Sequence, residues 1–301
     1  MNYNEFKEYL IEELSRRLGG DVTLSYKEVL KNNGIILDGL ILADKESNIS
    51  PTVYVNDFYD CFLGGMELKE IADEIENVYN RKNLDGNFET SFFMDLESVK
   101  SKIAFKIINA GLNNKLLETV PHRNYLDLAI CYYVVVDEKM ISNGTILITN
   151  EHMKMWKLQE EDLYEFAMTN SPRIREAQIM DMKDMLHELI IENNREEDID
   201  FLDGNMDGCM YVLSNKDKIF GAAAILYDDL IKNFSRKVNA NLYILPSSIH
   251  EVIIVPENCV DDSDYLNDMV CEVNATQVPK SEILSDHAYF YDGEKDLLTA
   301  C

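Results

Sequence analysis

The tripeptide Asn32-Asn33-Gly34 most constrains the fold, because it separates two extended, partly apolar runs at residues 22–30 and 35–42. Asparagine and glycine tolerate the positive φ angles that a tight turn requires, so this pattern predicts an antiparallel β-hairpin. A two-stranded hairpin is only marginally stable by itself. The chain must therefore cover this hairpin with helices or with further strands.

Helical patterns lie on both sides of the hairpin. Apolar residues recur every four positions over residues 6–18, and at i, i+3 and i+4 spacing over residues 68–79. A short strand is predicted at residues 52–55. Residues 1–83 are therefore expected to form an α-β-β-β-α module. The chain as a whole is expected to have a modular α+β fold, with small, mainly antiparallel sheets packed with helices.

Residues 84–195 are predicted to form a central helix-hairpin-helical module. Its first helix is expected at about residues 94–110. A long apolar run at residues 125–136 and a β-prone run at residues 144–149 come next. Together these two runs predict a buried hairpin.

Helices are expected to continue from there to about residue 194. Pro172 is predicted to separate two of them, because proline has no N–H and its ring clashes with the preceding helical turn. Ile179 and Met182 fall on the apolar stripe of the second helix. The methionines of this segment are interpreted as core residues.

The acidic, glycine-containing segment 192–208 predicts a hinge, because the pattern of elements changes after it. Residues 196–301 are assigned to a C-terminal α+β module. Its expected elements include a hairpin of residues 242–245 and 251–255 and a strand near residues 288–291.

The charge of the chain bears on its partners. Lys and Arg total 28 against 55 Asp and Glu, which gives a formal net charge of −27. A field of this sign repels phosphate backbones and anionic lipids, so direct binding of nucleic acid or membrane is not expected, although acidity also serves solubility. The N-terminus lacks a signal-peptide pattern, and no window approaches ~18 uncharged apolar residues. We expect a cytoplasmic protein that binds other proteins.

The cysteines and glycines point to no cofactor. The six cysteines are Cys61, Cys131, Cys209, Cys259, Cys271 and Cys301. They form no CxxC pair, so a zinc site is not indicated, and reduced, mostly buried thiols are expected. The Gly19-Gly20 and Gly64-Gly65 pairs lack the spacing and the lysine of phosphate-binding loops.

Two aromatic clusters could line a recognition surface or fill the core. Their members are Tyr54, Phe58, Tyr59 and Phe62 in the first and Tyr289, Phe290 and Tyr291 in the second. Aromatic residues are enriched in the centres of interfaces. They are also commonly buried, and core packing is the preferred interpretation.

Several separated blocks carry a resemblance to a known family. They are NNGIILDGL, NISPTVYVNDFYDCFLGG, RNYLDLAICYYVVV, LYILPSSIHEVIIVP and VNATQVPKSEILSDHAYFYD. Together they resemble an uncharacterised bacterial family, known as a domain of unknown function, from anaerobic Gram-positive bacteria of the gut type. The likeness covers about residues 3–292. It implies a bacterial cytosolic protein with this modular order, and it transfers no functional residue.

A possible cation site lies in the acidic hinge. Asp203, Asn205 and Asp207 occupy the first, third and fifth places of a loop with Gly208 at the sixth, which is the start of a calcium-binding pattern. The twelfth place is Ser214, where such loops have a bidentate glutamate. A solvated acidic linker explains the same residues, so calcium binding is an alternative hypothesis.

The C-terminal module holds the candidate catalytic residues. Ser247 or Ser248 could act as nucleophile and His250 or His287 as base, because serine needs a general base within hydrogen-bond reach. Asp286 or Glu251 could then orient the histidine. No GxSxG elbow is present, and Pro-Ser-Ser is also ordinary turn chemistry.

These observations lead to one prediction and two alternatives. The sequence contains no complete catalytic constellation, so we expect a non-enzymatic intracellular binding or adaptor protein. The alternatives are a hydrolase with a Ser/His site in the C-terminal module and a weakly calcium-regulated binding protein.

Overall fold

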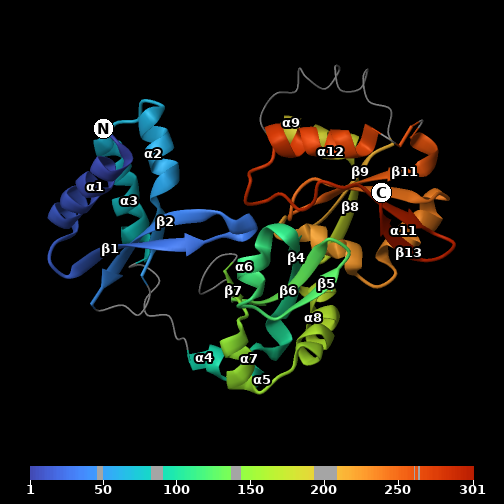
Figure 1. Ribbon diagram of the computed structural model, residues 1–301, viewed down its shortest axis with the longest axis horizontal. Coiled ribbons are helices and arrows are strands. Elements are labelled where there is room, and N and C mark those ends of the chain that lie inside the picture. Colours follow the sequence, from blue (N-terminus) through green and yellow to red (C-terminus); the bar gives the residue numbers. More distant parts are fainter. Residues whose placement is uncertain (46–49, 83–90, 137–143, 193–208, 261, 264) are drawn as a thin grey trace.

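The computed structural model describes residues 1–45, 50–82, 91–136, 144–192, 209–260, 262–263 and 265–301 (Figure 1). It confirms an α+β fold of small antiparallel sheets packed with helices. Within these ranges, no helix is both long and apolar enough to cross a lipid bilayer.

The N-terminal module packs helices on a three-stranded sheet of order β1-β2-β3 (Figure 1). Its elements are α1 (Tyr3–Leu18), β1 (Val22–Leu30), η1 (Asn32–Gly34), β2 (Ile36–Asp44), β3 (Thr52–Tyr54), α2 (Val55–Leu63) and α3 (Leu68–Lys82). The predicted hairpin is confirmed, since Leu30 pairs with Ile36 across the turn. Asn33 and Gly34 have φ angles of 59° and 69°, the left-handed values that the turn needs.

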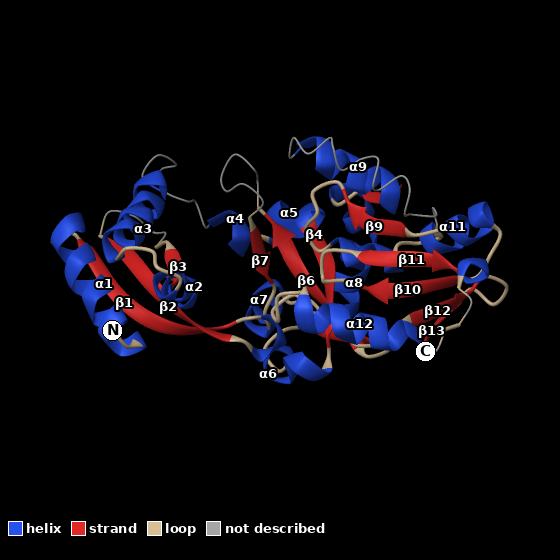
Figure 2. Cartoon of the chain, turned by 90° about the horizontal axis from the view of Figure 1, so that it is seen from above, coloured by secondary structure: helices blue, strands red, loops and turns tan. Residues whose placement is uncertain are grey.

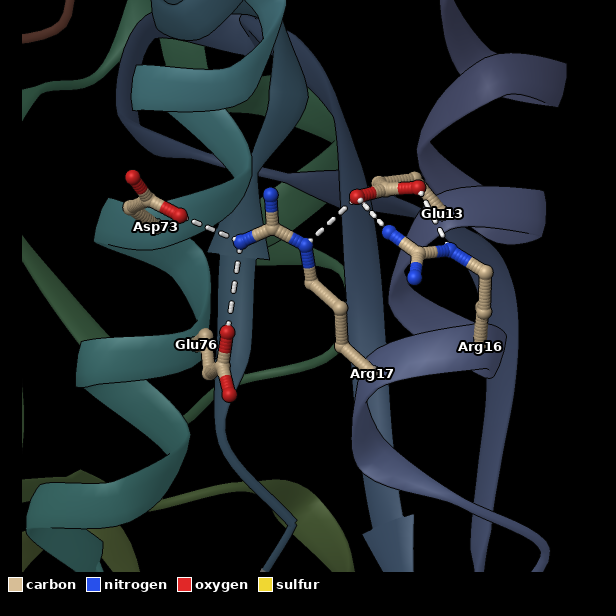
Figure 3. Close-up of polar contacts among 5 residues, drawn as sticks. All are labelled: Glu13, Arg16, Arg17, Asp73 and Glu76. Carbon is tan, nitrogen blue, oxygen red and sulfur yellow. Dashed lines mark hydrogen bonds and ion pairs between the residues drawn. The ribbon is translucent and has the colours of Figure 1, made fainter.

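One arginine joins two helices of this module (Figure 3). Arg17 of α1 binds Glu13 on its own helix through Nε at 2.7 Å. Its Nη1 reaches α3, where it lies 2.5 Å from Asp73 and 3.2 Å from Glu76. Arg16 also binds Glu13, at 2.6 Å. Arg17 therefore supplies a polar link between α1 and α3 beside their shared apolar core.

The central module is built on the strands β4, β5, β6 and β7. These are β4 (Ile103–Asn109), β5 (His122–Tyr125), β6 (Leu128–Val135) and β7 (Thr145–Leu147), with β6 paired to the other three. The helices are α4 (Ser91–Met94), α5 (Leu96–Val99), η2 (Lys100–Lys102), η3 (Gly111–Asn113), α6 (Asn114–Leu117), α7 (Asn150–Trp156) and α8 (Glu160–Ile174). The predicted hairpin of this module is confirmed by the β6–β7 pairing.

The helix predicted at residues 94–110 is wrong over most of its length. Residues 103–109 form β4, whose side chains are nearly all buried against both faces of the sheet. A run that is apolar on both faces has no clear period, so the choice between strand and helix depends on the partner strand, which here is β6.

Two more expectations about helices are corrected. Pro172 lies inside α8, in its last turn, so it comes just before the end of this helix at Ile174 and does not separate two helices. Ile179 belongs to a strand, β8 (Ala177–Asp181), and α9 (Met182–Glu192) begins only after it. Residues 177–181 form a strand because they pair with β9 (Tyr211–Asn215), which is distant in the chain.

The C-terminal sheet has six antiparallel strands in the order β13-β12-β10-β11-β9-β8. Figure 2 shows the strands from β13 to β9 side by side in this order. Its remaining elements are η5 (Gly221–Leu226), α11 (Leu230–Val238), β10 (Leu242–Pro246), β11 (Val252–Pro256), η6 (Glu257–Cys259), α12 (Tyr265–Thr276), β12 (Tyr289–Asp292) and β13 (Leu297–Ala300). The sheet thus begins before residue 196, where the sequence places the module boundary. It also shares one hydrophobic core with the central sheet, including Phe105 and Tyr132 on one side and Ile244 and Ile254 on the other.

The tip of the β1–β2 hairpin ties the N-terminal module to the other two (Figures 1 and 2). Asn32 Nδ2 donates to the Ser281 carbonyl at 2.7 Å, and Asn33 Nδ2 donates to the Ile283 carbonyl at 2.7 Å. Asn33 also bonds to Asn113 of η3. Asparagine can donate and accept at once, which suits it to a contact made of backbone groups.

The central sheet also binds the C-terminal segment whose carbonyl groups, at Ser281 and Ile283, the hairpin tip contacts. Asn109 Nδ2 donates to the Leu284 carbonyl at 3.2 Å. The Asp127 carboxylate accepts from Ser285 Oγ at 2.6 Å and from Tyr289 Oη at 2.7 Å. Residues 281–289 are therefore the segment on which all three parts of the fold meet.

The expected state of the cysteines is wrong in two respects. Cys209 and Cys259 form a disulfide, with Cα atoms 6.1 Å apart, because antiparallel pairing brings the start of β9 beside the end of β11. Of the four free cysteines only Cys131 is buried.

Candidate functional site

A cleft of about 520 Å³ opens where the central module meets η5, α11 and the edge of the C-terminal sheet. Ligand sites have volumes of this order. Ile130, Ile231 and Leu298 form apolar parts of its lining, and all three are buried in the core the two sheets share. The cleft therefore rests on the rigid junction of two sheets.

Four tyrosines line this cleft: Tyr125 at the end of β5, Tyr164 on α8, Tyr227 directly after η5 and Tyr291 on β12. Burial raises the pKa of Tyr125, and burial together with the nearby Asp296 raises the pKa of Tyr291. Both phenols are therefore neutral at neutral pH. Tyr291 Oη donates to Asp296 at 2.5 Å.

Three aspartates and one lysine are the charged residues of the lining. Asp228 and Asp229 precede α11 and are exposed, and Asp296 lies in the turn between β12 and β13. Lys232 Nζ lies 2.5 Å from Asp296 and 3.9 Å from Asp229. This ammonium and the Tyr291 hydroxyl hold the pKa of Asp296 below its usual value. The cleft thus has an excess of two negative formal charges.

One tyrosine of the cleft already carries a cation. The Arg123 guanidinium lies 3.9 Å from the centroid of the Tyr164 ring. Glu160 holds the same guanidinium at 2.6 Å, and Tyr132 donates to Glu160 as well. A cation over an aromatic face is attracted by the ring quadrupole. This part of the molecule therefore has the chemistry that binds amines and guanidinium groups.

The candidate residues Ser248 and His250 lie in the β10–β11 turn. Ser248 Oγ accepts from the His250 backbone N–H at 3.0 Å. His250 Nδ1 accepts from the Phe220 N–H at 3.3 Å, and its Nε2 lies 3.9 Å from Glu282. The Nδ1 contact places the proton of the neutral ring on Nε2. Ser248 thus meets the backbone of His250, not its ring.

The other candidates lie apart from that turn. Asp286 accepts from Asn274 of α12 at 2.8 Å, and the backbone N–H of His287 donates to Ser285 Oγ at 3.1 Å. Both residues are exposed, whereas Ser247 and Glu251 are half-buried in the turn. Among these candidate residues, no hydrogen bond joins a serine hydroxyl to a histidine ring.

The cation candidates Asp203, Asn205 and Asp207 lie outside the described residues. Within the described ranges, no group of three or more His, Cys, Asp or Glu side chains has the arrangement of a metal site.

Comparison with known proteins places the chain by its sequence. The model of DUF5688, a family of unknown function, matches residues 3–293. The chain belongs to the DUF5688 family. The near full-length resemblance to a family of unknown function is thereby confirmed. No curated protein and no solved structure matches the chain.

Sequence reasoning on this DUF5688 protein missed most of the cleft. Tyr291 belongs to an aromatic cluster that the sequence marks, and its ring is buried while its hydroxyl faces Asp296. Asp228, Asp229 and Lys232 form only a short charged stretch among many. The four tyrosines of the lining are 39 or more residues apart in the chain, so no local pattern could group them.

Proposed function

We propose that this DUF5688 protein is a non-enzymatic binding protein whose junction cleft takes a positively charged side chain of a partner protein. The observation that carries the proposal is the composition of the cleft. Four tyrosines and three aspartates surround an apolar floor, and one lysine of the lining opposes the acidic groups.

The charge of the cleft favours a cation over an anion. Lys232 already bridges Asp296 and Asp229, which shows that an ammonium group fits between these carboxylates. Asp228 is exposed beside them and can pair with a second cation. The chain's net charge of −27 adds a long-range attraction that raises the association rate of a basic partner.

The tyrosine rings can bind the apolar stem of a basic side chain, which the charged groups of the cleft do not bind. Lysine and arginine have long apolar stems, which can lie on aromatic rings while the charged end reaches a carboxylate. Arg123 on Tyr164 is an example within this protein. A basic side chain of a partner can use the half-buried Tyr125 in the same way.

The proposal is tested with a fluorescein-labelled hexalysine peptide and a hexaglutamate peptide of the same length, by fluorescence anisotropy. Hexalysine is expected to bind and hexaglutamate is not. The double variant Asp228→Asn/Asp229→Asn is expected to weaken hexalysine binding about tenfold, as loss of two partly exposed ion pairs allows.

A control variant distinguishes binding in the cleft from attraction by the overall negative charge of the chain. Glu8 and Glu12 are exposed on α1, so Glu8→Gln/Glu12→Gln removes the same charge far from the cleft. This control is expected to bind hexalysine as the unmodified protein does. If both double variants weaken hexalysine binding equally, net charge alone explains the binding and the proposal is wrong.

The bacterial and cytoplasmic origin expected from the sequence also stays a proposal. Fractionation of bacterial cells expressing the full chain, with an antibody against it, would test the location. Recovery in the membrane or secreted fraction would contradict it.

A further inference from the structure

The C-terminal sheet ends at β13, and this strand lies beside the junction cleft. Among the described residues, the strand partner of β13 is β12, so its other edge is the margin of the sheet (Figure 2). Asp296, directly before β13, and Leu298 within it both line the cleft. Leu297, Thr299 and Ala300 are exposed. An edge strand of this kind leaves backbone groups available for pairing with another strand.

The ladder between β12 and β13 shows which backbone groups point outward. The Cys301 N–H donates to the Ala288 carbonyl at 2.9 Å, so these two residues form a hydrogen-bonded pair. Hydrogen-bonded and non-hydrogen-bonded pairs alternate along an antiparallel ladder. Leu298 and Ala300 therefore direct their N–H and C=O groups away from β12. Within the described ranges, no backbone group of another element forms a hydrogen bond with these four groups.

A strand added beside β13 would direct side chains toward the cleft. Leu298 lies opposite Tyr291 of β12, and both line the cleft, so this face of the two strands forms part of its wall. Residues directly opposite on antiparallel strands share one face, with Cβ atoms about 4.5–5.5 Å apart. A partner residue opposite Leu298 would thus place its side chain at the cleft wall. The lining has three aspartates and one lysine, so the side chain that complements it is basic.

We propose that the binding segment of the partner protein is an extended strand that pairs antiparallel with β13 and carries a basic side chain opposite Leu298. This inference rests on the proposed function and adds the conformation in which the partner is recognised. Backbone hydrogen bonds to Leu298 and Ala300 bind the main chain, and the acidic cleft selects the side chain. The strand pairs of this sheet are antiparallel, which favours the same direction for an added strand.

The test uses the full chain and a fluorescein-labelled octapeptide of alternating lysine and valine, by fluorescence anisotropy. Side chains alternate along a strand, so all the lysines of this peptide lie on one face. When that face is turned to the cleft, antiparallel pairing directs the lysine N–H groups toward β13 and the valine N–H groups away from it. Methylation of the lysine backbone nitrogens is therefore expected to weaken binding about tenfold or more, because it removes the donors and places methyl groups between the strands. Methylation of the valine backbone nitrogens is expected to leave binding unchanged.

A variant of β13 tests the same contact from the side of the protein. Ala300→Pro removes an outward N–H and keeps the hydrogen bonds between β12 and β13, because proline is tolerated where the N–H of an edge strand faces solvent. It is expected to weaken binding of the lysine-valine peptide several-fold and to keep the unfolding midpoint. Ala300→Ser retains the N–H and is expected to bind the peptide as the unmodified protein does.

The outcomes distinguish this inference from the proposed function. Asp228→Asn/Asp229→Asn is expected to weaken binding of the lysine-valine peptide, as it does for hexalysine. If it does so, but methylation of the lysine nitrogens weakens binding no more than methylation of the valine nitrogens, the cleft binds the cation and the added strand is wrong. A peptide that does not bind, or that binds the aspartate variant equally well, contradicts the proposed function and this inference with it.

Discussion

Asn33 and Asn113 hydrogen-bond each other in both directions. The Asn33 backbone N–H donates to Asn113 Oδ1 at 2.8 Å, and Asn113 Nδ2 donates to Asn33 Oδ1 at 2.8 Å. Asn33 has the left-handed φ of the hairpin turn, and Asn113 is buried at the end of η3. A turn residue of one module thus completes the polar contacts of a buried residue in another.

Asn113→Ala is expected to lower the free energy of unfolding by about 1–3 kcal/mol, because it leaves buried polar groups at the hairpin tip without their hydrogen bonds. Urea unfolding measures this change. Hydrogen exchange should also show faster exchange at the tip. The control is Asn114→Ala at the next position, whose side chain is exposed and donates to the nearby Gly111 carbonyl, and it should change little. Equal effects of the two would show that the tip does not depend on this pair.

Arg17→Met is expected to lower the midpoint of thermal unfolding by about 1–3 °C, because Arg17 is the group that joins α1 to two carboxylates of α3. Arg16→Met serves as the control, since Arg16 is exposed and pairs with Glu13 on the same helix. An equal decrease in the unfolding midpoint of Arg16→Met would show that the effect comes from the ion pairs of Glu13 alone.

The contribution of Arg17 should also depend on pH. Hydrogen bonds from Arg16 and Arg17 lower the pKa of Glu13 to about 2, from an ordinary value of 4.5. A depressed carboxyl pKa stabilises the fold above the unfolded value and loses this effect as pH falls through the folded one. The difference in midpoint between the unmodified protein and Arg17→Met should therefore shrink between about pH 4.5 and pH 2. A constant difference over this interval would contradict the assignment.

Removal of the disulfide by Cys209→Ser/Cys259→Ser should lower the free energy of unfolding by about 2–4 kcal/mol under oxidising conditions, since the bond closes a loop of 50 residues. In dithiothreitol the two proteins should unfold at the same denaturant concentration. Mass spectrometry under non-reducing conditions checks the bond directly. Two free thiols at these positions would contradict the pairing.

Met168→Trp should block the cleft without changing its charge. Met168 lies half-buried in the lining on α8, and a larger ring there occupies space that a basic side chain would need. Hexalysine binding is expected to fall at least tenfold. Thr169→Trp adds the same ring at the adjacent exposed position and should leave binding intact. Unchanged binding in Met168→Trp would place the peptide elsewhere.

Local chemistry was enough to predict much of the N-terminal module. The hairpin at residues 32–34 and the helix over residues 68–79 follow from turn residues and from apolar periodicity, both of which act between near neighbours. The C-terminal hairpin of β10 and β11 was predicted for the same reason. By contrast, β4 and β8 were predicted as helix, because an apolar run becomes a strand only when another strand pairs with it.

The sequence by itself determined the α+β class, the acidic charge, the family and the short-range elements, since each depends on composition or on residues close together in the chain. Only the tertiary structure decided the sites. Tyr125, Tyr164 and Asp229 form one cleft because two sheets share a core, and Asn33 contacts Asn113 because a hairpin docks on another module. Such contacts join residues more than 35 positions apart, and their geometry depends on how sheets pack rather than on any local pattern.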